Sequence, residues 1–177
     1  TGLPRFDFLY KQFKLFNIKK KNIILFLEQP TFPKTKKERV NLIKKLNHIA
    51  HKMSKYKLII KPRFPSKIGH AHRMKFPLSS LILSTKNLAS NILISNKNLI
   101  HLYPRTKFAI TISSTAGIES MLIGIPTYFI NDFCKNNNSY GSHDFINFNS
   151  VIESKKIPNN KLPKINYKLA QSYLKFD

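Results

Sequence analysis

The chain has little that could cross-link it covalently or through a metal. Cys134 is the single cysteine among 177 residues, so an internal disulfide is excluded. The 6 histidines are scattered, and none has the spacing typical of metal ligands. We therefore expect neither a disulfide-stabilised secreted domain nor a metal site, and we expect no bound cofactor.

Long apolar runs are also missing. No segment reaches the roughly 18 uninterrupted apolar residues that a transmembrane helix needs. The first residues, Thr1–Asp7, contain neither the apolar core of a signal peptide nor an initiator methionine. We therefore expect a cytoplasmic location and a chain that is a piece of a longer protein.

Acidic residues are scarce. Only 8 Asp and Glu stand against 31 Lys and Arg, which gives a formal net charge of +23. Such a charge attracts nucleic acids, anionic ligands and anionic membranes. Most of the basic residues are lysines accompanied by abundant asparagine and isoleucine, as expected from an AT-rich genome, and no nucleic-acid-binding motif is recognisable. A nucleic-acid-binding module is therefore kept as an alternative only, and peripheral contact with the inner face of the cytoplasmic membrane is expected.

Buried strands and helices are predicted to alternate along the chain. Short apolar runs typical of covered strands occupy 22–28, 57–60, 92–95, 108–112 and 128–130. Helical patterns fall between them, the longest at 36–54 with Thr35 as its N-cap, and the last at 166–176. The alternation favours an α/β fold with a Rossmann-like, doubly wound parallel sheet.

Three parts of the chain can be distinguished. Residues 1–21 are expected to be a linker from a missing N-terminal domain, 22–150 the Rossmann-like domain, and 151–177 a C-terminal tail and helix. The composition, 42% hydrophobic, is sufficient for a core of that size.

The stretch Lys107–Asp132 is the most informative one. It reads as a strand, a polar turn, a short helix that Gly124 closes and Pro126 cannot continue, and a second strand. Its helix has apolar residues at the i, i+3, i+4, i+7 spacing. The polar turn therefore lies between the end of a strand and the start of a helix.

That turn is a candidate anion site. Ser113, Ser114 and Thr115 precede or open the helix, whose first N–H groups lack helical partners. Gly117 would allow close approach of a phosphate, and Glu119, one turn after Thr115, could accept hydrogen bonds from sugar hydroxyls. A hydroxyl cluster at this position is more often only an N-cap, which is the alternative interpretation.

A second candidate loop follows the strand at 57–60. It concentrates Lys61, Arg63, His70 and His72. Loops at the carboxyl ends of parallel strands form the ligand crevice of an open α/β sheet, and an arginine can hold a phosphate or carboxylate with two hydrogen bonds. A solvated basic loop is the alternative.

Four motifs together carry a family resemblance. Thr1–Asp7 (TGLPRFD), Leu27–Pro30 (LEQP), the loop Lys61–Pro77 and Ser113–Phe133 (SSTAGIESMLIGIPTYFINDF) occur in this order. They resemble the carboxyl-terminal half of a GT-B glycosyltransferase, with the closest match in a bacterial glycosyltransferase-like family without assigned activity. That family is similar in outline to capsule and lipopolysaccharide transferases, and the resemblance extends to about Asn147.

The resemblance implies one half of a GT-B architecture, in which this half binds a nucleotide-sugar donor. It implies that Ser113, Ser114 and Thr115 hold the donor phosphate, that Gly117 permits close approach, and that Glu119 contacts the ribose. Lys61, Arg63, His70 and His72 would complete the anion pocket. GT-B enzymes generally need no divalent metal, and their catalytic acid or base usually belongs to the N-terminal domain, so none is assigned here.

The resemblance to bacterial sialyltransferases is partial. Those enzymes carry a His-Pro motif after one strand and a Ser-Ser motif after a later one, whereas this chain has Ser113-Ser114 but Lys61-Pro62-Arg63 in place of His-Pro. The implied function is transfer of a sugar from a nucleotide-sugar to a cell-surface glycan or glycolipid. A sugar-nucleotide epimerase or hydrolase of the same fold is the alternative enzyme.

Overall fold

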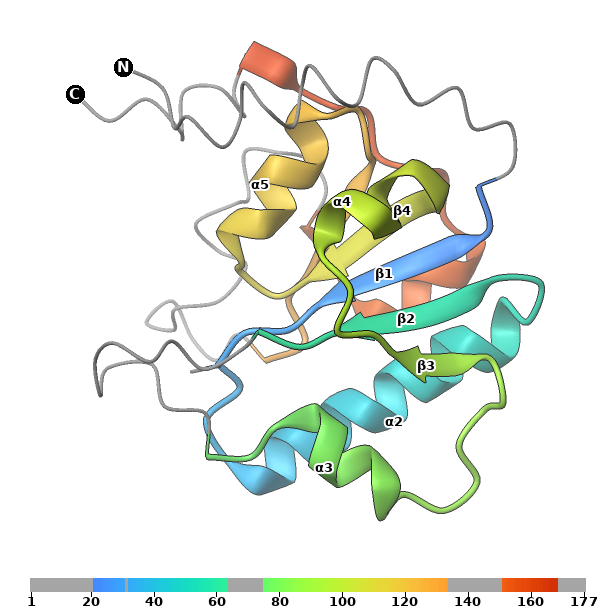
Figure 1. The fold of residues 1–177 in the computed structure, drawn as a ribbon, viewed down its shortest axis with the longest axis vertical. Coiled ribbons are helices and arrows are strands. Elements are labelled where there is room, and N and C mark those ends of the chain that lie inside the picture. The colour runs from blue at the N-terminus through green and yellow to red at the C-terminus, as the bar shows by residue number, and fades with distance from the viewer. Residues whose placement is uncertain (1–20, 31, 64–74, 134–150, 169–177) are drawn as a thin grey trace.

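A six-stranded sheet forms the centre of the computed structural model, which describes residues 21–30, 32–63, 75–133 and 151–168. The strands are β1 (Ile23–Leu27), β2 (Lys57–Lys61), β3 (Ile92–Ile94), β4 (Thr106–Thr111), β5 (Thr127–Ile130) and β6 (Val151–Ile152). Their order in the sheet is β3-β2-β1-β4-β5-β6, and every pairing is parallel (Figure 1). The predicted Rossmann-like, doubly wound parallel sheet is confirmed.

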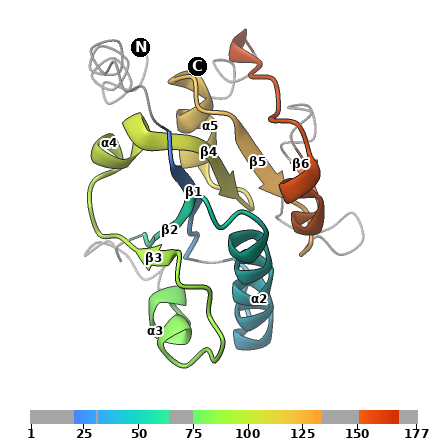
Figure 2. The ribbon, with the colours of Figure 1, turned by 90° about the vertical axis from the view of Figure 1, so that its right-hand side faces the viewer.

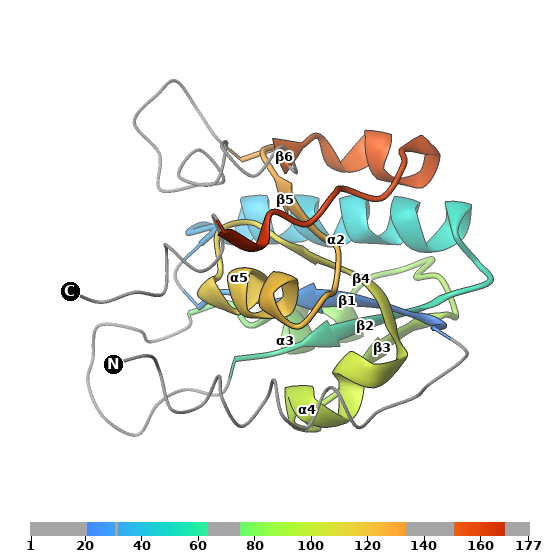
Figure 3. The same ribbon diagram turned by 90° about the horizontal axis from the view of Figure 1, so that it is seen from above.

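Helices cover both faces of this sheet. They are α2 (Lys36–Lys52), α3 (Leu78–Leu83), α4 (Leu99–Leu102) and α5 (Thr115–Leu122), with 3-10 helices η2 (Tyr103–Arg105) and η4 (Ser154–Asn159). Figure 2 shows α2 and α3 together, apart from α4 and α5. Figure 3 shows η4 beside α2, on the side of the sheet opposite α4.

The side-chain alternation of β1 explains this two-sided arrangement. All five residues of β1 are buried. Ile24 and Phe26 pack with the apolar residues of α2, α3 and η4, whereas Leu25 and Leu27 pack with those around α4 and the end of α5. A strand that is apolar on both faces needs a helical layer on each, which is why β1 occupies the middle of the sheet.

The boundaries of the helices follow local signals. Thr35 forms a capping box with Glu38, in which the Thr35 hydroxyl accepts the Glu38 amide and the Glu38 carboxylate accepts the Thr35 amide. His48 and His51 are exposed on α2, as expected for surface residues of this helix. Gly124, with φ of 82°, ends α5 in the left-handed region. The predicted strand ends differ from the observed ones by one or two residues.

The sheet extends beyond residue 150, where the sequence placed the end of the domain. Val151 and Ile152 form β6, which pairs with β5. Asp132, just after β5, accepts hydrogen bonds from the amide and hydroxyl of Ser154 at 2.8 and 2.9 Å and pairs with Lys45 of α2 at 2.7 Å. The start of the C-terminal segment is therefore packed on the sheet domain. Most of the helix expected at 166–176 lies outside the described residues.

Candidate functional site

The carboxyl ends of the central strands border a cavity of about 670 Å³. It lies where the strand order reverses, because the chain proceeds from β1 outward through β2 and β3 and then returns to β4 on the other side of β1. Ligands of open α/β sheets bind at this switch point. The lining residues are Leu27, Glu28, Lys61, Pro62, Arg63, Asn96, Asn98, Leu99, Ile100, Ser114, Thr115, Ala116 and Glu119.

The turn between β4 and α5 forms one wall of the cavity. Ser114 is the N-cap of α5, and its hydroxyl oxygen accepts a hydrogen bond from the Ala116 amide at 3.3 Å. The N-cap interpretation is therefore correct as far as it goes. The hydroxyl proton is not used in that bond, and the amide of Thr115, the first residue of the helix, has no partner within the helix. Both groups are donors at a helix start that borders the cavity.

Ser113 is placed differently from its two neighbours. Its amide donates to Oε1 of Gln29 at 3.0 Å, and its hydroxyl lies within hydrogen-bonding distance of both Oε1 and Nε2 of Gln29, at 3.1 and 3.0 Å. Ser113 is not among the residues that line the cavity. Of the three predicted hydroxyl residues, only Ser114 and Thr115 border it.

Gly117 approaches the sheet rather than the cavity. A Cβ atom at this position would lie 2.8 Å from Cγ2 of Thr111 and 3.1 Å from Cε1 of Phe129. Gly117 is buried, and it is absent from the lining. The close approach seen here is between helix and strand, and not the approach of a phosphate that the sequence predicted; it lets α5 pack closely on β4 and β5.

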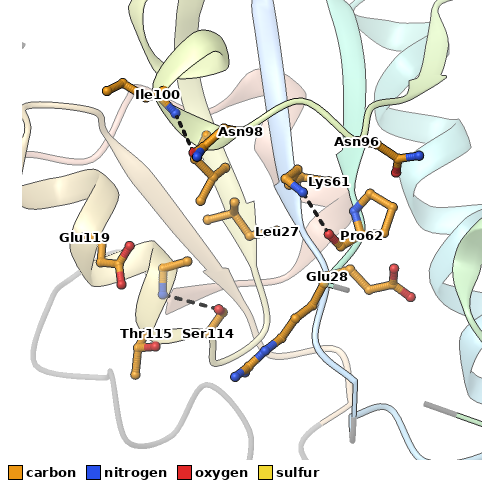
Figure 4. A pocket seen from close by; sticks show the side chains of 13 residues that line it. Leu27, Glu28, Lys61, Pro62, Asn96, Asn98, Ile100, Ser114, Thr115 and Glu119 are labelled. Carbon is orange, nitrogen blue, oxygen red and sulfur yellow. Dashed lines mark hydrogen bonds between the residues drawn. The ribbon is translucent and has the colours of Figure 1, made fainter. Parts of the chain in front are cut away.

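Glu119 follows on the same wall, one turn beyond Thr115. It is only 7% exposed, yet it borders the cavity. Figure 4 shows Ser114, Thr115 and Glu119 on one side of the cavity and Lys61 and Pro62 across from them. The two stretches that the sequence singled out thus meet at one site.

The opposite wall begins where β2 ends. Lys61 is partly buried, its Nζ donates to the Pro62 carbonyl at 3.1 Å, and burial lowers the pKa of its ammonium group. Arg63 is exposed and also lines the cavity. His70 and His72, predicted for the same pocket, lie outside the described residues.

The sequence interpretation missed a third contribution, from the segment after β3. Asn96, Asn98, Leu99 and Ile100 line the cavity with two amides and two aliphatic side chains. Asn98 caps α4 by accepting the Ile100 amide at 3.3 Å. Their position directly after a predicted parallel strand is the signal that could have identified them.

A buried ion pair lies at the edge of the cavity, which one of its members, Glu28, lines. Glu28, which follows β1, accepts hydrogen bonds through Oε1 from Nη1 of Arg39 at 3.0 Å and from the Leu78 amide at 2.9 Å. Figure 4 shows its carboxylate turned away from α5. Burial raises the pKa of the Glu28 carboxyl, against the opposing effects of Leu78 and Arg39.

Arg39 fixes the course of the loop after β1. Its remaining guanidinium donors bind the carbonyl oxygens of Pro33, Gln29 and Pro30 at 2.8–2.9 Å. The side chains of Arg39 and Glu28 are 2% and 1% exposed. Arg39 therefore holds in place the loop that carries Gln29, whose side chain contacts Ser113 in the turn before α5.

The chemistry available at the cavity is that of anion and hydroxyl recognition. Lys61 and Arg63 supply cations opposite the α5 start, Glu119 and the two asparagines supply groups for hydroxyls or a heterocycle, and the side chains after β3 supply aliphatic surface. Within the part of the chain that the structure describes, no three His, Cys, Asp or Glu residues gather as a metal site would require. Among the same residues, no helix is long and apolar enough to cross a membrane.

Comparisons with known proteins give a family match and a structural similarity. A family model described as "Putative glycosyltransferase (DUF6716)" matches residues 6–168. The chain is also similar to the solved structure "Crystal Structure of TarM", with 18% identity and a TM-score of 0.47. That alignment covers 88% of this chain and 28% of the TarM chain, so this chain spans a minor part of the other's length. No curated protein matches the chain.

Proposed function

The chain belongs to the glycosyltransferase-like family DUF6716, and from this premise we propose that it is the donor-binding half of a GT-B glycosyltransferase. In this proposal the cavity at the carboxyl end of the sheet takes a nucleotide-sugar, and a preceding N-terminal domain supplies the acceptor site and the catalytic acid or base. The acceptor would be a cell-surface glycan or glycolipid, as in capsule or lipopolysaccharide synthesis, and the reaction would take place in the cytoplasm without a bound metal.

The observation that carries the proposal is the convergence of two sequence-distant elements on one cavity. Ser114 and Thr115 at the start of α5 and Lys61 and Arg63 after β2 all line it, so helix-start donors and cationic side chains border the same space. Helix-start donors and cationic side chains suit a diphosphate, because together they hydrogen-bond its oxygens and balance its charge. Glu119 lines the same wall as Ser114 and Thr115, and in this proposal its carboxylate accepts hydrogen bonds from a ribose diol.

Replacing Ser114 with alanine is expected to weaken binding of the donor nucleotide by about 1–3 kcal/mol, because a hydroxyl that pairs with phosphate would be lost. Calorimetric titration with CMP, CDP, UDP, GDP and CMP-sialic acid at moderate salt measures this and identifies the base. Arg63→Ala should also weaken binding of the same nucleotide. The matched control is Ser84→Ala, because the Ser84 hydroxyl donates to the Leu81 carbonyl at the end of α3, outside the cavity.

The result also separates the rival functions. An unchanged nucleotide affinity in folded Ser114→Ala would remove Ser114 from the site. A sugar-nucleotide epimerase or hydrolase would alter the donor without any acceptor, which product analysis detects. Steeply salt-dependent binding of duplex DNA with no nucleotide preference would favour the nucleic-acid-binding module instead.

Peripheral contact with an anionic membrane is the remaining part of the proposal, and α2 supplies the surface for it. Lys37, Lys44 and Lys52 are exposed on this helix and recur at a spacing that keeps them near one face. Each lysine near an anionic surface contributes about 1 kcal/mol.

The triple substitution of Lys37, Lys44 and Lys52 by glutamine is therefore expected to reduce binding to phosphatidylglycerol vesicles by more than about tenfold in a flotation assay. A control triple substitution of Lys161, Lys164 and Lys168, which are exposed in the C-terminal segment, changes the charge equally. Equal losses in the two triples would contradict a docking role for α2, as would equal binding of the natural protein to neutral vesicles.

A further inference from the structure

Gln29 connects the loop after β1 to the turn before α5. Its Oε1 accepts the Ser113 amide at 3.0 Å, and its amide group contacts the Ser113 hydroxyl at 3.0 and 3.1 Å. The two residues are 84 positions apart in the chain. Gln29 does not itself line the cavity, so its contribution must pass through the turn that does.

The backbone alone cannot supply this connection. The pairing between β1 and β4 ends at Phe26 and Ile110, and the chain leaves β1 toward Pro30. Beyond that point the Gln29 side chain accepts a hydrogen bond from the Ser113 amide, as a backbone carbonyl of a neighbouring strand would. Ser113 is partly buried, and an amide withdrawn from water without such a partner is costly, which favours one position of the turn.

Two further contacts hold both ends of this connection. The Gln29 carbonyl oxygen accepts Nη2 of the buried Arg39 at 2.8 Å. On the other side, the Thr111 hydroxyl donates to the Leu27 carbonyl at 3.1 Å and accepts the Ser114 amide at 3.3 Å. The turn is therefore attached to the end of β1 at two successive points.

We propose that Gln29 is a positioning residue, which sets the Ser114 hydroxyl and the first amides of α5 at the place where they bind the phosphates of the ligand. This role rests on the proposed nucleotide-binding function. The proposed role predicts that a change at Gln29 weakens the binding of phosphates and not that of a nucleoside. In the proposal the phosphates contact the turn directly, whereas the nucleoside part of the ligand contacts the rest of the cavity wall.

The test uses Gln29→Met, which keeps the length of the side chain and removes its hydrogen bonds. Nuclear magnetic resonance titrations measure affinities for inorganic pyrophosphate, for the preferred nucleoside diphosphate and for the corresponding nucleoside. We expect both phosphate-bearing ligands to bind about tenfold more weakly and the nucleoside to bind unchanged. In the unliganded protein, hydrogen exchange of the amides of Ser113 and Ser114, which donate to Gln29 and Thr111 in the natural protein, should be faster.

Two further variants separate positioning from general stability. Ser113→Ala keeps the bond between the Ser113 amide and Gln29, so it should retain most of the pyrophosphate affinity. Asn47→Ala is the matched control, because Asn47 similarly accepts the Ala89 amide at 2.8 Å and donates to the Asn87 carbonyl at 3.1 Å. Asn47 lies on α2 and binds the loop before β3, and it is not among the residues that line the cavity, so this substitution should leave pyrophosphate binding unchanged.

The outcomes are distinguishable. If Gln29→Met binds pyrophosphate as tightly as the natural protein, or loses pyrophosphate and nucleoside affinity equally, the positioning role is wrong while the proposed function stands. If the natural protein binds neither pyrophosphate nor any nucleotide, the proposed function fails and the role of Gln29 fails with it.

Discussion

Replacing Arg39 with methionine is expected to lower the free energy of unfolding by about 3–5 kcal/mol, because it leaves the Glu28 carboxylate buried without its cation. The guanidinium also donates to the carbonyl oxygens of Gln29, Pro30 and Pro33, which would lose those partners. Urea denaturation followed by circular dichroism measures the change. Arg105→Met is the matched control, since Arg105 is exposed, and we expect an effect within about 0.5 kcal/mol.

A second substitution isolates the ion pair from the loop contacts. Glu28→Gln in the Arg39→Met background removes the orphaned charge and keeps an acceptor for the Leu78 amide. The double variant should therefore be more stable than Arg39→Met alone. The single variant Glu28→Gln is measured as well. If the double variant is destabilised, relative to the natural protein, by the full sum of the effects of Arg39→Met and Glu28→Gln, the two charges do not interact in the folded protein.

Replacing Gly117 with alanine is expected to destabilise the protein by about 1–3 kcal/mol and to abolish measurable nucleotide binding, because the added methyl group overlaps β4. It would lie 2.8 Å from Cγ2 of Thr111. The Thr111 side chain cannot rotate away without breaking the bonds of its hydroxyl to Leu27 and Ser114. We therefore expect the start of α5 to move instead, which thermal denaturation and nucleotide titration together detect.

The matching rescue is Thr111→Ser combined with Gly117→Ala. Serine retains the hydroxyl and lacks the methyl group that the new Cβ meets, so part of the stability and of the nucleotide affinity should return. The contacts with Phe129 at 3.1 and 3.2 Å remain, which limits the recovery. If Gly117→Ala is as stable as the natural protein and binds nucleotide normally, the close packing of α5 is not required for the site.

Much of the fold could be predicted because its signals are local. The apolar run of β1, the Thr35 N-cap and the Gly124 helix end each lie within a few adjacent residues, and each was predicted correctly in type. The strand alternation then implied the parallel sheet. The sixth strand was missed because Val151 and Ile152 form only two ladder pairs, too short a run to show a period.

The candidate site was predictable only in part, because its supports are distant in sequence. Ser114 and Lys61 could be proposed from their positions after predicted strands, and both line the cavity. The role of Gln29 could not be inferred, since its partner Ser113 lies 84 residues away and no spacing rule connects them. Arg39 lies in a lysine-rich helix start that reads as solvent-exposed, and its burial is visible only once Glu28 is in place.

The strand order also determines when each neighbour of β1 becomes available during synthesis of the chain. β1 is flanked by β2, which follows it after one helix, and by β4, which begins only at Thr106. A ribosome adds about 5–20 residues per second, so one edge of the central strand waits several seconds for its neighbour during synthesis. A strand edge without its neighbour has unpaired backbone groups, so this edge of β1 is the part of the sheet open longest to pairing with another chain during synthesis.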